Sequence, residues 1–238
     1  IVAYREGKQK IEKKLGSEDV HLLEMIGSLP YPKEFPVVAF PFDDMWEAPR
    51  LRTRGITHIH HMFLPRAAHL VSSIWSRIDN VVDDRIRSML RFWIDQSLWG
   101  FSVLNRYRLR AYSHVNQYMS GVFYVPSQIA EVSANYNLLG KLARLPQAFD
   151  HKTSRTNYGV STASTTSLSI AENSLDYIFV DPPFGDNFPY AELNFIVESW
   201  LGVRTQSEPE AIVDRSKKNR AKQKSLDDYI QLLRACFS

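Results

Sequence analysis

The stretch LDYIFVDPPFGDNFPYAELNFIVESWLG, residues 175–202, decides the predicted fold. It opens with a nearly continuous apolar and aromatic run, residues 175–180, which is typical of a buried strand. Two prolines follow at 182 and 183, and proline cannot extend a strand ladder. The sequence therefore places Asp181 at the carboxyl end of a strand, the edge at which open α/β sheets bind ligands.

A helix is predicted directly after this strand. Apolar residues recur at helical spacing from Leu193 to Leu201, and Gly202 suits the left-handed residue that ends many helices. The stretch as a whole therefore predicts a strand, a polar loop and a helix. The simplest structural interpretation of Asp-Pro-Pro-Phe at 181–184 is that it forms only a rigid turn after a buried strand.

The same four residues carry a resemblance to a known enzyme family. DPPF at 181–184 resembles the catalytic Asp-Pro-Pro-aromatic motif of the S-adenosylmethionine-dependent amino-methyltransferases, and SLDYIFVDPPFGDNFPYAELNFIVESWLG is similar to the bacterial adenine-specific DNA methylases. RTRGITHIHHMFLPR at 52–66 resembles an upstream segment of the same proteins. These stretches cover about a fifth of the chain. The resemblance implies S-adenosylmethionine as cofactor and methylation of adenine N6 in DNA.

The chemistry of such a reaction explains the residue types of the motif. An exocyclic amine on an aromatic base is a poor nucleophile, because its lone pair is delocalised into the ring. Acceptors at the Asp181 carboxylate and the Pro182 carbonyl would draw the nitrogen towards a tetrahedral geometry and stabilise its developing charge. Pro183 restricts the backbone, Phe184 would stack on a flipped-out base, and Asp181 is also expected beside the cofactor.

Composition sets the broad class of the protein. The chain has 238 residues, and 44% of them are hydrophobic, which allows a substantial core. Its formal net charge of +3 is small, so a DNA-binding surface would have to come from local patches of basic residues. A single cysteine, Cys236, excludes an internal disulfide framework and fits a reducing compartment. With no membrane-length apolar run and no signal-peptide pattern, we expect a cytoplasmic protein without a membrane partner.

Glycine usage suggests that the chain is part of a longer protein. It begins at Ile1, stops at Ser238 within an apparent helix, and has 10 glycines, none in a Gly-x-Gly turn between a strand and a helix. In the resembled family that cofactor loop precedes the Asp-Pro-Pro motif, so we expect it to lie before Ile1. The chain alone is then expected to be inactive and to bind S-adenosylmethionine weakly.

The pattern along the chain divides it into three regions. Residues 1–60 predict two short amphipathic helices and then a proline-rich extended segment. Residues 61–150 predict a helical region, with helices over 64–79, 83–99 and 128–145. Residues 151–238 predict a polar boundary loop and a partial methyltransferase catalytic core. The fold class is α/β, a partial Rossmann-like methyltransferase sheet with a mainly helical region before the motif strand.

Basic side chains offer candidate phosphate contacts. For the arginines of the helical region, surface positions that cover helix ends are an equally good interpretation, and for the basic run near the end the alternative is a disordered loop. The candidates are Arg85, Arg87, Arg91, Arg106, Arg108 and Arg110 in the helical region, and Lys217, Lys218 and Arg220 near the end. His58, His60 and His61 lack partners at metal-ligand spacing, so we predict no metal site.

The sequence favours a DNA adenine-N6 methyltransferase and leaves several alternatives open. The partner would be DNA, together with a restriction nuclease or another defence-system protein. Related Asp-Pro-Pro-aromatic motifs serve cytosine N4 and RNA guanine amines as well. A non-catalytic DNA-binding fragment is the alternative of a different class, and the missing glycine-rich turn favours it.

Overall fold

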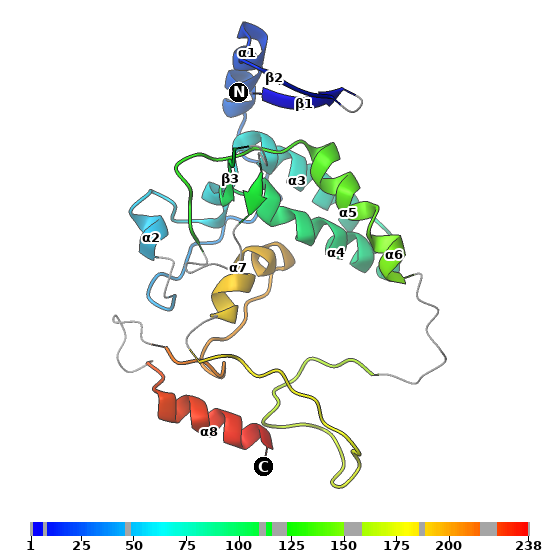
Figure 1. Ribbon diagram of the computed structural model, residues 1–238, viewed down its shortest axis with the longest axis vertical. Helices are drawn as coiled ribbons and strands as arrows, with labels where there is room; N and C mark the ends of the chain where they lie inside the picture. The colour runs from blue at the N-terminus through cyan, green and yellow to red at the C-terminus, as the bar shows by residue number, and fades with distance from the viewer. Residues whose placement is uncertain are drawn as a thin grey trace.

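The chain combines a body of helices with small antiparallel sheets (Figure 1). A computed structural model describes residues 2–6, 9–45, 49–109, 113–115, 123–149, 159–185, 189–214 and 223–237. Within these ranges the two sheets each have two antiparallel strands, β1–β2 and β3–β4. The mixed helical and strand content agrees with the coarse fold class expected from the sequence.

The centre of the body is a pair of long helices, α3 (Pro65–Asp79) and α4 (Asp84–Phe101). Pro65 occupies the first turn of α3, where its missing N–H costs nothing. The Asp83 carboxylate accepts a hydrogen bond from the Ile86 N–H at 2.9 Å and so caps α4. Both helices were predicted from their apolar spacing, and both predictions are confirmed.

Helix α7 (Tyr190–Leu201) packs its aromatic side chains into this body. The Trp200 ring lies 4.7 Å from Phe35 and 5.1 Å from Trp75, measured between ring centroids. Gly202 ends the helix with φ of 68°, the left-handed conformation that glycine adopts without strain. The predicted helix and its glycine cap are confirmed. Buried residues from all three predicted regions share one hydrophobic cluster.

The first 28 residues form a hairpin and a helix. Strands β1 (Val2–Glu6) and β2 (Gln9–Lys13) pair antiparallel, and α1 (Ser17–Gly27) follows them. The prediction of a helix before Gly16 is therefore wrong, because the hairpin satisfies these backbone groups through a partner only a few residues away. Helix α1 has no buried residue and contacts α3 at one end of the molecule (Figure 1).

The segment from residue 29 to 45 is extended, as its prolines predict, but it contributes to the core. Phe35, Phe40 and Met45 are buried. The Phe40 N–H donates to the Thr57 carbonyl at 3.0 Å, which ties the segment to the turn before α3. Two short helices border that turn, α2 (Pro49–Arg52) and the 3-10 helix Ile59–Met62.

After α4 the chain forms short elements that cover its surface. They are β3 (Asn105–Arg106), β4 (His114–Val115), a π-helix (Asn135–Leu139), α5 (Gly140–Leu142) and α6 (Leu145–Phe149). A Cβ on Gly100 would lie 2.6 Å from the Asn137 Nδ2, so glycine permits the close approach of α4 and the π-helix. Helix was predicted from Gln128, but 128–133 is not helical. Pro146 was predicted to end that helix, but it lies in the first turn of α6, where a proline ring is tolerated.

The predicted strand over 175–180 does not form, and this prediction is wrong for the structure described. The segment is extended and exposed, with Tyr177 at 80% and Phe179 at 81% relative exposure. Among the described residues, no hydrogen bond involves the backbone of 175–182. A strand requires a neighbouring strand to satisfy its N–H and C=O groups, and no described segment provides one.

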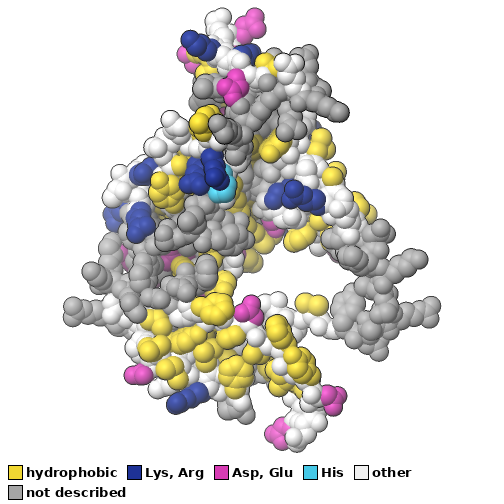
Figure 2. Space-filling model, in the orientation of Figure 1, with side chains coloured by type: hydrophobic (Ala, Val, Ile, Leu, Met, Phe, Trp, Pro, Cys, Tyr) yellow, Lys and Arg dark blue, Asp and Glu magenta, His cyan; other side chains and the backbone are white. Residues whose placement is uncertain are grey.

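This segment and α8 (Leu226–Phe237) together expose apolar side chains. Figure 2 shows hydrophobic side chains gathered over the lower part of the molecule, where Figure 1 places α8 and the chain leading to α7. The exposed apolar residues there include Tyr177, Ile178, Phe179, Val180, Leu226, Ile230 and Phe237.

No helix in the described ranges has the length and apolar character needed to cross a bilayer.

A carboxylate inside the helical body makes the fold sensitive to pH. Asp95 lies on α4, and burial raises its pKa to about 6 although the positive charge of Arg91 opposes this shift. The Asp95 Oδ1 is buried and has no hydrogen-bond partner in the described ranges. The native state therefore holds a proton that the unfolded chain has already lost between about pH 4 and 6. Stability falls across this window as the pH rises.

We predict that Asp95→Asn removes this dependence. At pH 7 to 8 the variant should gain on the order of 1–2 kcal/mol in unfolding free energy, allowing for solvent screening, and the gain should shrink towards zero near pH 4. Urea unfolding monitored by circular dichroism at several pH values measures it. Asp43→Asn, at an exposed aspartate, is the matched control. A gain that does not change with pH would contradict the prediction.

Candidate active site

The four motif residues lie in an irregular loop that leads towards α7. Asp181 is exposed, Pro182 and Pro183 are half-buried, and Phe184 is 60% exposed. The acidic side chain and the aromatic ring are thus accessible while the backbone between them is partly covered. This is an arrangement in which both side chains can contact an external ring system.

Two hydrogen bonds from later parts of the chain hold the loop. The Tyr229 hydroxyl, in the first turn of α8, donates to the Pro183 carbonyl. The Val213 N–H donates to the Gly185 carbonyl at 3.0 Å. Gly185 has φ of 58°, which allows the chain to turn directly after Phe184. The motif is therefore held on its carboxyl-terminal side by two separate segments.

Glu210 caps the helix that follows the motif. Pro189 precedes α7 and its side chain cannot accept a hydrogen bond. The Glu210 Oε1 instead accepts from the N–H groups of Tyr190 at 2.6 Å and Ala191 at 3.3 Å. Burial raises the pKa of Glu210 although these two donors and Lys224 favour the charged form. A carboxylate near the positive end of the helix dipole stabilises α7.

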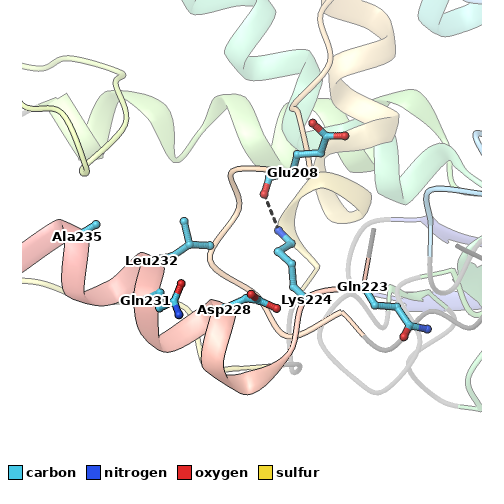
Figure 3. Close-up of a pocket in the computed structure, with 7 residues that line it drawn as sticks. All are labelled: Glu208, Gln223, Lys224, Asp228, Gln231, Leu232 and Ala235. Atoms are coloured by element: carbon cyan, nitrogen blue, oxygen red, sulfur yellow. Dashed lines mark hydrogen bonds between the residues drawn. The ribbon is translucent and has the colours of Figure 1, made fainter. Parts of the chain in front are cut away.

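Lys224 joins the loop around Glu210 to the start of α8. Its ammonium donates to the carbonyl oxygens of Ser207, Glu208 and Glu210. Its backbone pairs with Asp214 in an isolated bridge. Burial lowers the pKa of Lys224, and neighbouring carboxylates oppose the shift. Figure 3 shows the Lys224 side chain extended towards Glu208 across the space beside α8.

Helix α8 begins with a capping box and contacts the motif segment at both ends. The Ser225 hydroxyl accepts from the Asp228 N–H at 3.2 Å, and the Asp228 carboxylate accepts from the Ser225 N–H at 2.7 Å. Near the other end, the Cys236 Sγ lies 3.0 Å from the Thr165 hydroxyl. The segment from 165 to 183 therefore runs beside α8.

An open pocket of about 470 Å³ lies between α8 and the 207–210 turn (Figure 3). Its lining mixes polar and apolar surface and consists of Glu208, Gln223, Lys224, Asp228, Gln231, Leu232 and Ala235. Neither Asp181 nor Phe184 lines it. The pocket is thus separate from the motif side chains, and the motif is presented on a loop.

The candidate phosphate contacts do not form one track. Arg87 pairs with Asp84, and Arg91 pairs with Asp79 at 2.7 Å. Arg85 lies in the first turn of α4, whereas Arg106 and Arg108 follow its last turn, so about 24 Å of helix separates them. Arg85 and Arg108 are exposed and form no ion pair with a described residue. Arg110, Lys217, Lys218 and Arg220 lie outside the described residues.

The three histidines cluster beside the core. The rings of His60 and His61 lie 4.1 Å apart, and the Thr57 N–H donates to the His61 Nδ1 at 3.1 Å. Burial and the neighbouring histidines lower the pKa of His60. Within the described ranges, no group of three or more His, Cys, Asp or Glu side chains is arranged to hold a metal ion.

The described residues do not form a cradle for S-adenosylmethionine. The glycines with left-handed conformations, Gly55, Gly185 and Gly202, end turns or helices and do not join a strand to a helix. The segment 164–168 is exposed as well.

Sequence reasoning missed the residues that hold the motif. Glu210, Lys224 and Tyr229 act across 14 to 46 positions of the chain, and only the Ser225-Leu-Asp-Asp228 capping box has a local sequence signal. Tyr229 lies in the helix that the sequence indicates before Ser238. Its hydroxyl contact was not foreseen.

We predict that Glu210→Ala destabilises the chain by about 1–2 kcal/mol, because two N–H groups at the start of α7 lose their acceptor. Glu210→Gln keeps an oxygen acceptor and should lose less than half of this amount. Glu208→Ala is the matched control, since its side chain is exposed and Lys224 contacts only its carbonyl. Chemical denaturation measures all three. Equal stabilities of the Glu210→Ala and Glu208→Ala variants would contradict the capping role.

Comparison with family models, with curated proteins and with solved structures gives no match to this chain. The residues and geometry described above are therefore the basis for a functional proposal.

Proposed function

We propose that this chain carries the amine-binding motif of an S-adenosylmethionine-dependent DNA methyltransferase that acts on adenine N6. The observation that supports the proposal is the Asp181-Pro182-Pro183-Phe184 loop, with an exposed carboxylate and an exposed ring on a backbone held by Tyr229 and Val213. A rigid turn that only connected two elements would not need an exposed aromatic ring beside an exposed acid.

In this proposal the motif prepares the amine for attack. The Asp181 carboxylate and the Pro182 carbonyl accept the two N–H groups of the adenine amine, which localises the nitrogen lone pair. Phe184 stacks on the flipped-out base and limits its rotation. S-adenosylmethionine supplies an electrophilic methyl group when bound. The positive charge that develops on the amine is stabilised by the same two oxygens.

We further propose that residues 175–180 are a strand of a Rossmann-like sheet in the active protein. Their β-branched and aromatic composition and their unpaired backbone support this assignment. A strand there would place Asp181 at the carboxyl edge, where such sheets bind ligands.

We predict that Asp181→Ala slows methyl transfer by a hundredfold to a thousandfold, because one of the two preorganised acceptors is lost. The change should leave the fold intact, since Asp181 is exposed. Single-turnover transfer of labelled methyl to an adenine-containing duplex, in the full-length protein, measures the rate. Asp176→Ala is the matched control, because it removes an exposed carboxylate from the same segment.

Two further comparisons define the outcome. Phe184→Ala should weaken capture of the base by roughly 1–3 kcal/mol, and Phe184→Tyr should retain most activity because the stacking face is kept. A duplex in which the target adenine is replaced, leaving cytosine as the only amine acceptor near the site, tests the base. A near-normal rate from folded Asp181→Ala would contradict the proposed function, and transfer to cytosine alone would reassign the base.

We predict that duplex DNA affinity depends on the free arginines more than on the paired ones. Changing Arg85 and Arg108 together to alanine should flatten the salt dependence of binding by up to about two units. Changing Arg87 and Arg91 together should have less effect, because each is already neutralised by an aspartate. Fluorescence anisotropy at several salt concentrations measures both slopes. Identical slopes for the two double variants would contradict phosphate contacts by Arg85 and Arg108 and would indicate that these side chains only face solvent.

A further inference from the structure

Between the Cα atoms of Asp181 and Phe184, the backbone has one torsion that its own sequence leaves free. The rings of Pro182 and Pro183 fix φ at both residues. Asp181 and Pro182 each precede a proline, which restricts their ψ angles to the extended region. The next rotatable bond, ψ of Pro183, is not restricted in this way, because Phe184 follows it. This torsion sets the direction of the Pro183 carbonyl and the position of Phe184 relative to Asp181.

The Tyr229 hydroxyl binds the group that this torsion moves. It donates to the Pro183 carbonyl, so rotation about ψ of Pro183 breaks the hydrogen bond. Tyr229 is half-buried, and it lies one residue after Asp228 of the capping box. Lys224 fixes the chain before that box through three carbonyl oxygens. The hydroxyl is therefore presented from a well-anchored helix start.

We propose that Tyr229 is a positioning residue that orients Phe184 against the acceptors at Asp181 and Pro182 by fixing the Pro183 carbonyl. This role rests on the proposed methyltransferase function. Tyr229 contacts neither the amine nor the base in this proposal, and it acts through the backbone. The bond from the Val213 N–H to the Gly185 carbonyl restrains the other side of Phe184, so the ring is held between two fixed carbonyl groups.

The test uses Tyr229→Phe in the full-length protein, which removes the hydroxyl and keeps the ring. Release of the Pro183 carbonyl should loosen the loop, so hydrogen exchange at the Val213 amide should rise about fivefold. The single-turnover rate at saturating duplex should fall about fivefold, with the duplex dissociation constant changed by less than twofold. Tyr136→Phe, at an exposed tyrosine of the π-helix, is the matched control and should change neither readout.

The outcomes separate this role from the proposed function. If Asp181→Ala abolishes transfer while Tyr229→Phe changes neither the rate nor the Val213 exchange, the positioning role is wrong and the function stands. If Tyr229→Phe raises the Val213 exchange but Asp181→Ala transfers methyl normally, the contact exists but the function fails, and the positioning role of Tyr229 fails with it. A loss of duplex affinity with an unchanged rate at saturation would also overturn positioning.

Discussion

The packing of Trp200 against Phe35, Phe63 and Trp75 holds the distant parts of this chain in one core. Phe35 comes from the extended segment, Trp75 from α3 and Trp200 from α7. Burial of such rings is among the largest single contributions to a core, about 3–5 kcal/mol when one is truncated. Because α7 is fixed by this contact, the loop before it is restrained at the end that carries Phe184.

The helices were predictable because their hydrogen bonds are local. In α3, α4, α7 and α8 the backbone donors beyond the first turn meet acceptors four residues away, and the apolar spacing that defines each helix lies inside it. The stretch over 175–180 has an equally clear apolar pattern. A strand also requires a neighbouring strand, and no described segment supplies one, so composition indicates what the segment can do without fixing what it does here.

The candidate site also contains residues with local sequence signals and residues whose contacts are long-range. Asp181 to Phe184 could be predicted because four adjacent residue types carry the chemistry. Glu210, Lys224 and Tyr229 could not, because a glutamate twenty positions after a helix start or a tyrosine in a later helix has no pattern that names its target. These contacts follow from the path of the chain between 203 and 229. The structure thus adds a supporting frame to a motif that the sequence already identifies.

The aromatic contact also has a consequence for synthesis on the ribosome. Phe35 and Trp75 leave the ribosome long before Trp200, since about 125 residues separate the two tryptophans. At roughly 5–20 residues per second, the apolar face of the first helices waits on the order of 6 to 25 seconds for α7. During this interval the nascent chain exposes a surface that chaperones recognise. Yield in the cell would then depend on translation speed and chaperone supply as well as on the stability of the finished fold.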